Sequence, residues 1–347
     1  MTSLPNGLRE QLGRDYTLHS LELVRKQGSR DMTRKFLWRL HDHSLIESVL
    51  IPANPALFGG ASDRHTLCVS TQVGCAYGCR FCASGLDGWK RNLGVEEIVE
   101  QVLAAERWYA KATRNRESGA PNQPDAAREG IRESRITDHA SRFIDNLVIM
   151  GMGEPLANYD HLLQALSILN APWGGGIGAR KITISTSGLA PQIRKLADEP
   201  LQFRLAISLH GATDEVRDRI MPVNRKYPLR ELTSAAEYYR KKKGKMITLE
   251  YILIAGVNDG IDQAAPLARL AHRLKAKINL IPYNQVDGLP WMRPAEEVQE
   301  AFLAALEKLK VTATLRREKG HDIDAACGQL RLRTHRELVR ESEALNR

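Results

Sequence analysis

Three cysteines lie within eight residues of one another in the segment CAYGCRFC. Cys75, Cys79 and Cys82 have the spacing Cys-x3-Cys-x2-Cys, and an aromatic residue, Phe81, precedes the third. Three thiolates can hold three irons of a 4Fe-4S cluster, which leaves the fourth iron open to a substrate. A structural zinc site takes four protein ligands, and Cys68 is the only nearby candidate for a fourth. The spacing therefore favours a cluster, with zinc or unligated thiols as the alternatives.

A second group of polar residues follows the expected strands. The segment MGMGEPL has glycines that permit close backbone approach, and its Glu154 carboxylate can accept a hydrogen bond from an ammonium group. Hydroxyl, imidazole and amide groups come at three later strand ends, in Ser185-Thr186-Ser187-Gly188, Ser208-Leu209-His210 and Pro282-Tyr283-Asn284. Such groups can bind the carboxylate, ribose and adenine that S-adenosylmethionine (SAM) presents. Each motif alone would also suit a tight turn or a strand-end cap.

A further cysteine lies near the C-terminus, in the segment DIDAACGQL. A lone cysteine is commonly a small buried apolar residue, and this is one interpretation of Cys327. The small residues around it and the following Gly328 favour another, a thiol on an accessible loop.

These residues need a scaffold that brings strand ends together. From His65 onward, helical patterns separate seven β-branched segments: HTLCVS, NLVIM, KITIST, FRLAIS, ITLEYILI, INLIPY and TATLRR. Strands separated by helices of this length predict βαβ units, a parallel sheet and right-handed crossovers. About six such units indicate an α/β fold, a partial (β/α)6 barrel, with the chemistry at the carboxyl ends of its strands.

Three segments are expected along the chain. Residues 1–60 form a short N-terminal module in which RKFLWRL and LIESVLIP pair as a β-hairpin. Residues 61–332 form the barrel, and residues 112–141, which are poor in apolar side chains, are a flexible insertion within it. Residues 333–347 form a basic C-terminal tail.

Composition and charge limit where the protein works and what it binds. Five cysteines, an odd number, do not suit a secreted disulfide framework. Residues 1–30 do not resemble a signal peptide and no apolar run of about eighteen residues could cross a bilayer, so we expect a cytoplasmic protein with no membrane partner. A formal net charge of +9 favours a phosphate-rich partner. Basic residues gather at Arg34-Lys35, Lys90-Arg91 and Arg331-Arg333-Arg336, and we expect Trp89-Lys90-Arg91 and the arginine-rich C-terminal segment to hold RNA.

Taken together, these motifs resemble the RlmN/Cfr family of radical SAM RNA (adenine) methyltransferases, most closely its RlmN members. The resemblance runs from about Leu21 to Leu332 and is carried by CVSTQVGCAYGCRFCASG, MGMGEPLANYD, STSG, AISLH, INLIPYN and DIDAACGQL. It implies one 4Fe-4S cluster held by Cys75, Cys79 and Cys82. It implies that SAM is contacted by Gly153, Glu154, Ser185, Ser208, Leu209, His210 and Asn284.

The resemblance also implies a reaction. Cys327 would carry a methyl group, Cys68 would be its redox partner, and Glu47 would be the proton acceptor, although its place in a strand suggests only an exposed carboxylate. The expected activity consumes two SAM molecules per turnover and methylates C2 of an adenine in 23S rRNA, with tRNA as a second candidate substrate. Cfr proteins methylate C8 with the same cysteines, so the ring position stays open.

The implied reaction needs further partners, and two other interpretations compete with it. An external electron donor such as flavodoxin and a disulfide reductant are expected, and the protein is expected to be a monomer. A radical SAM enzyme of another class, such as a glycyl-radical activase, would explain the cysteine triplet but gives no role to Cys68 and Cys327. A non-enzymatic basic RNA-binding protein with a zinc or iron-sulfur staple is the remaining alternative.

Overall fold

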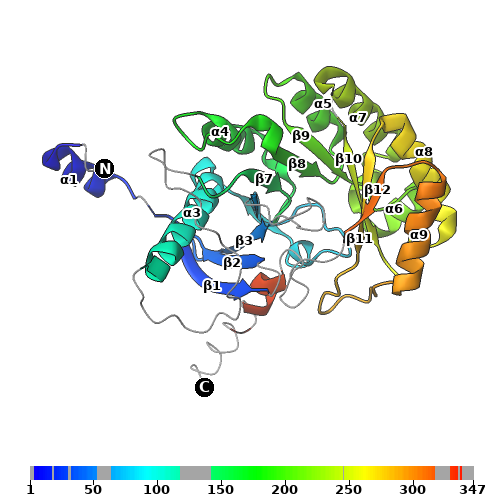
Figure 1. Cartoon of the computed structure of the whole chain (residues 1–347), viewed down its shortest axis with the longest axis horizontal. Helices are drawn as coiled ribbons and strands as arrows, with labels where there is room; N and C mark the ends of the chain where they lie inside the picture. Colours follow the sequence, from blue (N-terminus) through cyan, green and yellow to red (C-terminus); the bar gives the residue numbers. More distant parts are fainter. Residues whose placement is uncertain are drawn as a thin grey trace.

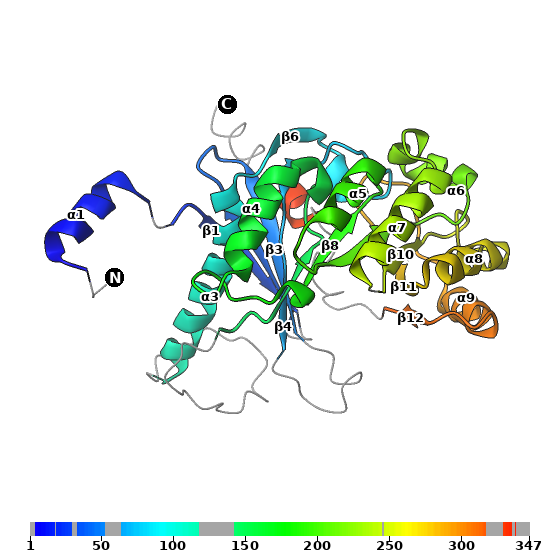
Figure 2. The ribbon, with the colours of Figure 1, turned by 90° about the horizontal axis from the view of Figure 1, so that it is seen from above.

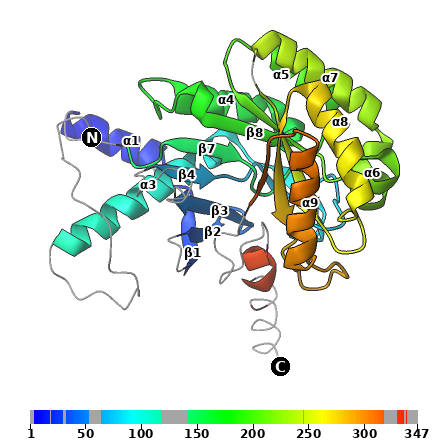
Figure 3. The ribbon, with the colours of Figure 1, turned by 45° about the vertical axis from the view of Figure 1, so that its right-hand side comes forward.

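The structure, a computed structural model, describes residues 4–17, 19–29, 33–52, 64–117, 142–244, 246–316, 329–334 and 337. Within these residues, ten strands form one sheet in the order β1-β2-β3-β4-β7-β8-β9-β10-β11-β12. The sheet curves, and a layer of helices covers its outer face (Figures 1 and 3). The strand order is linear, so the curve stays open, as a partial barrel does.

The parallel part of the sheet contains the seven predicted strands. These are β4 (His65–Cys68), β7 (Asn146–Ile149), β8 (Ile182–Thr186), β9 (Arg204–Ser208), β10 (Thr248–Leu253), β11 (Lys277–Pro282) and β12 (Ala313–Leu315). Each pairs in parallel with its neighbour. Because all their carboxyl ends meet at one edge, the residues that follow these strands gather there. The predicted fold class is confirmed.

Seven helices accompany these strands. They are α3 (Val95–Glu117), α4 (Tyr159–Asn170), α5 (Ala190–Asp198), α6 (Asp214–Ile220), α7 (Leu229–Lys243), α8 (Ala264–Leu274) and α9 (Glu296–Lys308). In Figure 3, α5, α7, α8 and α9 form an arc outside the strands. The helix α3 continues to Glu117, so the first residues of the predicted insertion at 112–141 are helical, and residues 118–141 lie outside the described residues.

Three antiparallel strands extend the parallel sheet at one edge. The predicted hairpin is present as β2 (Arg34–Arg39) and β3 (Leu45–Pro52), which pair from Arg34↔Leu50 to Arg39↔Leu45. The strand β3 also pairs with β4, so the sheet runs without a break from the N-terminal module into the barrel. The division at residue 60 stays a prediction.

Two N-terminal elements did not follow from the sequence patterns. The strand β1 (Glu22–Gly28) pairs with β2 at the edge of the sheet, and its polar sequence gives no alternation of apolar residues. The helix α1 (Asn6–Asp15) has no buried residue and projects away from the rest of the chain (Figure 2). Neither element buries a face that a hydrophobic pattern could reveal.

A separate two-stranded sheet, also unpredicted, holds the two ends of the cysteine loop, residues 75–88. It pairs β5 (Gln72–Gly74) with β6 (Trp89–Asn92) in antiparallel register, Gly74 opposite Trp89. Gly74 has a φ of 76°, and a Cβ there would lie 1.9 Å from the carbonyl oxygen of Gly88. Only glycine fits this approach. Among the described residues, no helix combines the length and apolarity that a bilayer crossing requires.

Candidate active site

The cysteine loop is anchored on both sides. The strands β5 and β6 hold its two ends, and the Cys75 N–H donates to the Gly88 carbonyl at 3.1 Å. In the middle, the Arg80 N–H donates to the carbonyl of Ile220, and the Trp291 indole N–H donates to the carbonyl of Arg80 at 2.8 Å. The three predicted ligands, Cys75, Cys79 and Cys82, are all half-buried. The loop is therefore held at the carboxyl edge of the parallel strands.

The three thiols suit a positively charged metal group. Burial raises the pKa of Cys75 to about 12 and that of Cys79 well above its usual value, and the charge of Cys82 adds to both increases. Three such thiolates repel one another unless a cation binds them. Among the described residues, no three His, Cys, Asp or Glu side chains are grouped so that they could hold a metal ion, and this includes Cys75, Cys79 and Cys82. Cluster binding must therefore release thiol protons and draw the sulfur atoms together.

Glu154 is a buried carboxylate beside this loop. It is 3% exposed and follows β7; its Oε2 accepts the Ser187 N–H at 2.6 Å and its Oε1 accepts the Leu156 N–H at 3.0 Å. Burial raises its pKa, while these hydrogen bonds oppose the increase. Gly153, with a φ of 97°, makes the turn just before it, where a Cβ would lie 2.5 Å from the Cβ of Gln72. A buried carboxylate of this kind is stabilised by a ligand cation.

Hydroxyl groups meet at the ends of the next two strands. The Oγ atoms of Ser185 on β8 and Ser208 on β9 lie 3.2 Å apart. Within the described residues, three nearby buried hydroxyls make no hydrogen bond: Thr71 Oγ1, Ser187 Oγ and Tyr283 Oη. Asn284, half-buried, follows Tyr283 beyond β11. Buried polar atoms without partners are costly, so these groups fit a site for a polar ligand such as SAM.

His210 connects the strand ends to the cysteine loop. Its ring packs edge-on against Phe81 with 5.0 Å between ring centres, and Phe81 precedes Cys82. The Ile252 N–H donates to His210 Nδ1 at 3.0 Å, so a proton on the neutral ring is on Nε2. Burial, and secondarily the charge of Arg217, lowers the pKa of His210 to about 3. The imidazole is therefore neutral at physiological pH.

We expect this neutral histidine to make stability depend on pH. Below pH 6.5 the unfolded chain binds a proton at His210 that the folded chain does not bind until about pH 3. The free energy of unfolding therefore falls with decreasing pH across this window, by up to about 1.4 kcal/mol per pH unit. His210→Asn removes this proton, and asparagine tolerates the φ of 54° at this position. In urea unfolding between pH 6.5 and 5, the free energy of unfolding should fall less steeply in the variant, because the variant lacks the proton that His210 takes up on unfolding. The same pH dependence in the two proteins would contradict a buried neutral histidine.

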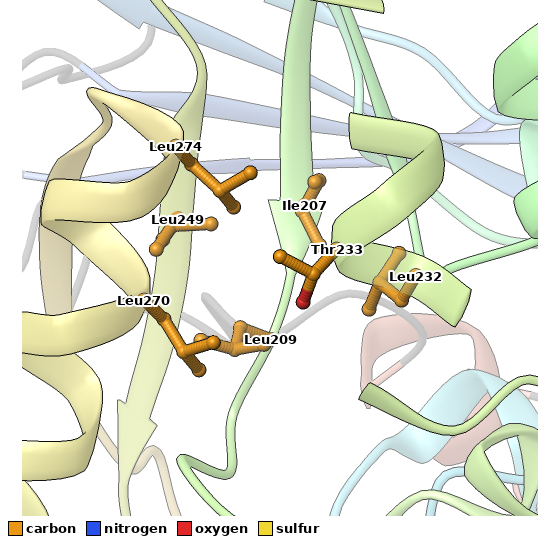
Figure 4. A pocket seen from close by; sticks show the side chains of 7 residues that line it. All are labelled: Ile207, Leu209, Leu232, Thr233, Leu249, Leu270 and Leu274. Atoms are coloured by element: carbon orange, nitrogen blue, oxygen red, sulfur yellow. The ribbon is translucent and has the colours of Figure 1, made fainter. Parts of the chain in front are cut away.

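Leu209 faces the helix layer. Its side chain lines a small apolar space between β9, β10 and the helices α7 and α8 (Figure 4). The other lining residues are Ile207, Leu232, Thr233, Leu249, Leu270 and Leu274, which make this space a gap in the core away from the polar strand ends. Any contact of Leu209 with SAM would involve its backbone.

Arg217 supports the site, and no sequence pattern predicted it. The side chain is fully buried and donates to Asn224 Oδ1 at 3.0 Å, to the Leu209 carbonyl at 3.0 Å and to the Ser187 carbonyl at 2.6 Å. Burial lowers its pKa to about 10, so it stays charged at neutral pH. Its charge lowers the pKa of Cys79, against the larger effect of burial. It therefore joins two strand-end loops and places a fixed positive charge near the cysteines.

Glu47 lies in the interior, contrary to the exposed carboxylate that its strand position suggested. It is 2% exposed, and its Oε2 lies 3.0 Å from the Nζ of Lys35, which is 0% exposed. Lys35 is therefore part of a buried ion pair and not of a basic surface. Glu47 Oε1 accepts the backbone N–H of Arg331 at 2.6 Å.

Cys68 shares a face of the sheet with Glu47. Cys68 pairs with Val49 across β3 and β4, and Glu47 lies two residues before Val49. Side chains of directly opposed residues, and of residues two apart on a strand, point to the same face, with diagonal neighbours about 7–8 Å apart. Cys68 is 5% exposed. Cys68 and Glu47, the residues expected to act as redox partner and proton acceptor, thus share one side of the sheet.

The residues after Cys327 bind to this same face. Residues 329–334 are helical and are drawn in red beside β2 in Figure 1. Leu330 packs against Leu37 and Leu45, and the Gln329 side chain donates to the carbonyl of Gln285 beyond β11. Cys327 itself lies outside the described residues.

The expected RNA contacts are partly used within the protein. Arg91 binds Glu97 through two nitrogens, at 2.7 and 2.8 Å, and also binds Asp42 at 2.7 Å. Trp89 is 51% exposed and Lys90 is exposed. Of the predicted trio, only Trp89 and Lys90 present their side chains to an incoming RNA.

Comparison with known proteins gives one consistent result. Residues 124–267 match the Radical SAM superfamily. The probable dual-specificity RNA methyltransferase RlmN 3 of Opitutus terrae is 53% identical over 340 residues, which covers 97% of this chain and 84% of that protein. The probable RlmN of Akkermansia muciniphila is 50% identical and covers 97% and 85%. The crystal structure of a radical SAM methyltransferase from Sphaerobacter thermophilus, 42% identical, has a TM-score of 0.80 and covers 94% and 86%.

Proposed function

Because the chain belongs to the RlmN family of radical SAM RNA methyltransferases, we propose that it methylates C2 of an adenine in 23S rRNA. The route uses two SAM molecules per turnover and an S-methyl group on Cys327. The names of both relatives describe a dual specificity, and we propose tRNA as the second substrate.

Radical SAM enzymes carry a 4Fe-4S cluster and use SAM. When bound, the cluster supplies the electron that cleaves SAM to a radical able to take hydrogen from a methyl group. In this chain, Cys75, Cys79 and Cys82 would ligate three irons. Glu154 lies close enough to Cys75 for their charges to interact, so its carboxylate can receive the ammonium group of SAM.

The hydroxyl groups at the strand ends would bind the rest of SAM. Ser185 and Ser208 can donate to its carboxylate or ribose, and Asn284 can bind the adenine edge. His210 would bind through the Nε2 proton that its hydrogen bond with Ile252 requires. Gly153 and the backbone of Leu209 complete the proposed contacts.

Two cysteines and one carboxylate would then carry out the transfer of the methyl group. The Cys327 thiolate displaces the SAM sulfur and keeps the methyl group; hydrogen abstraction from it gives a carbon radical that adds to the adenine ring. The adduct must lose one electron, for which the cluster, oxidised when it cleaved SAM, would be the acceptor, and Glu47 would take the ring proton. Cys68 attacks the Cys327 sulfur, the carbon–sulfur bond breaks, and its electron pair takes up a proton to complete the new methyl group. An external dithiol reduces the resulting disulfide.

The observation that carries this proposal is the hydrogen bond from the Arg331 N–H to Glu47. It joins the segment that follows Cys327 to the proposed proton acceptor, on the sheet face that also holds Cys68. A cysteine relay requires such a connection, because the residue that carries the methyl group and the proton acceptor must reach the same base.

The proposed reaction also implies redox partners, a cellular location and an oligomeric state. An external one-electron donor such as flavodoxin must reduce the cluster, and a dithiol must reset the cysteine pair. Because the substrates are RNAs, we propose that the enzyme works in the cytoplasm. We propose a monomer because all of the assigned groups come from one chain.

Product analysis tests the proposed function. Anaerobically reconstituted holoenzyme is incubated with methyl-labelled SAM and a 23S rRNA fragment, and the digested nucleosides are identified by mass spectrometry. Labelled C2-methyladenosine is expected. C8-methyladenosine would place the chain with Cfr in its chemistry, and label on nitrogen or no label would refute carbon methylation. About one zinc and no iron per chain would instead favour a structural staple.

A further inference from the structure

Arg331 combines a buried charge with an unused binding edge. It is 3% exposed, and its Nη1 donates to Asp87 Oδ2 at 2.8 Å. In the described part of the structure, its two other side-chain nitrogens, Nε and Nη2, are buried and make no hydrogen bond. These two nitrogens form one edge of the planar guanidinium. A buried cation with an unsatisfied edge is costly, and an oxyanion that meets both donors would relieve that cost.

The shape of this edge selects the ligand. Two parallel N–H groups match the two oxygens of a phosphate or carboxylate, which is the usual bidentate geometry of arginine. Asp87 already takes Nη1 and only partly neutralises the charge. Asp87 is itself about one-third exposed, so Arg331 lies between the interior and the surface, where a nucleic-acid backbone would pass.

The position of Arg331 ties this edge to the reacting base. Its own backbone N–H contacts Glu47, the carboxylate that would take the proton from the target adenine. In the proposed reaction, Glu47 must lie within hydrogen-bond reach of that base, so the Arg331 backbone would be one residue removed from it. An adenine that enters an active site leaves its stack, and the phosphates beside it follow into the protein.

We propose that the Nε and Nη2 edge of Arg331 binds an RNA phosphate next to the target adenine. This inference rests on the proposed RNA substrate and adds a contact to it. Because these nitrogens are buried, the phosphate reaches them only if the surrounding side chains move as the RNA enters. Arg331 would then hold the RNA backbone with its side chain and the Glu47 carboxylate with its backbone N–H. The positions of the RNA and of Glu47 would therefore both depend on the helical residues 329–334.

A methylphosphonate scan of the RNA tests the contact. Reconstituted holoenzyme is titrated with rRNA fragments that each carry one neutral methylphosphonate, the position moving past the target adenine. We expect one linkage beside the adenine at which the substitution weakens wild-type binding about ten-fold and lowers the salt dependence of log K by about 0.7. Arg331→Gln should bind unmodified RNA about ten-fold more weakly and be insensitive at that same linkage.

Two variants complete the scan. Arg204→Gln, a change at an exposed arginine at the amino end of β9, on the edge of the sheet opposite the site, should keep the wild-type response at the sensitive linkage. Arg331→Lys retains a charge without the fork and should show an intermediate response. If Arg331→Gln does not fold, the wild-type scan and the lysine variant still decide. Uniform sensitivity at every linkage, or an equal response in wild type and Arg331 variants, overturns the phosphate site. If wild type binds no RNA at all, the proposed function fails instead.

Discussion

Replacing Cys68 with alanine is expected to leave the RNA covalently bound to Cys327 after a single methyl addition. In the proposed route, Cys68 is the thiol that attacks the Cys327 sulfur and frees the product. The substitution leaves Glu47 in place, so proton loss can proceed and only release is blocked. We expect steady-state turnover to fall by more than about 10³-fold. Denaturing gel electrophoresis of the reaction with labelled rRNA should show a band that contains both protein and RNA.

The Cys68→Ala/Cys327→Ala double variant is the control for this adduct. It retains the three cluster cysteines, so its iron content should match that of wild type, but it has no sulfur on which RNA could be held. The gel band should therefore disappear. Product release from Cys68→Ala at the wild-type rate would show that another group resolves the adduct and would remove Cys68 from the mechanism.

Lys35→Met is expected to destabilise the protein by about 3–5 kcal/mol, because it leaves the buried Glu47 carboxylate without the cation 3.0 Å away. Lys35 and Glu47 are 0% and 2% exposed, so water cannot replace the lost charge. The effect should appear as a lower thermal midpoint of the holoenzyme. Methylation should fall as well, because without Lys35 the Glu47 carboxylate is no longer held in position to act as a base.

The Lys35→Met/Glu47→Leu double variant separates the two effects. Removing both charges should restore most of the lost stability, because a buried ion pair replaced by apolar residues is often neutral. Methylation should stay lost, since the proton acceptor is gone. Equal thermal midpoints for wild type and Lys35→Met would show that Glu47 does not depend on this lysine.

The parallel strands could be predicted because each is short, rich in β-branched residues and followed by a turn. In β11, for example, Ile278, Leu280 and Pro282 are buried in alternation, a pattern that the sequence shows directly. The strand β1 shows no such pattern because it lies at an edge. The strands β5 and β6 have three and four residues, too few for a period to appear.

The site could be predicted less completely, because the type of a residue does not reveal which side chain or carbonyl it will bind in the fold. The cysteine spacing and the strand-end motifs indicated which residues meet at one edge of the sheet. Lys35 looked like a surface charge, yet its alternation with Leu37 in the hairpin already placed it on the face of Glu47. For Arg217, the sequence of α6 gives no sign that this arginine turns inward, because its three hydrogen-bond acceptors come from three separate segments.

The pairing of β3 with β4 joins two parts of the chain that would have different roles, the N-terminal hairpin and the barrel. The residues proposed to hold the cluster and SAM all come after β4, whereas the proposed proton acceptor, Glu47, belongs to the hairpin before it. In the proposed route, the hairpin would therefore add the proton acceptor to a barrel that generates the radical. Because backbone hydrogen bonds join β3 to β4, main-chain geometry and not side-chain packing sets the position of Glu47 relative to the barrel.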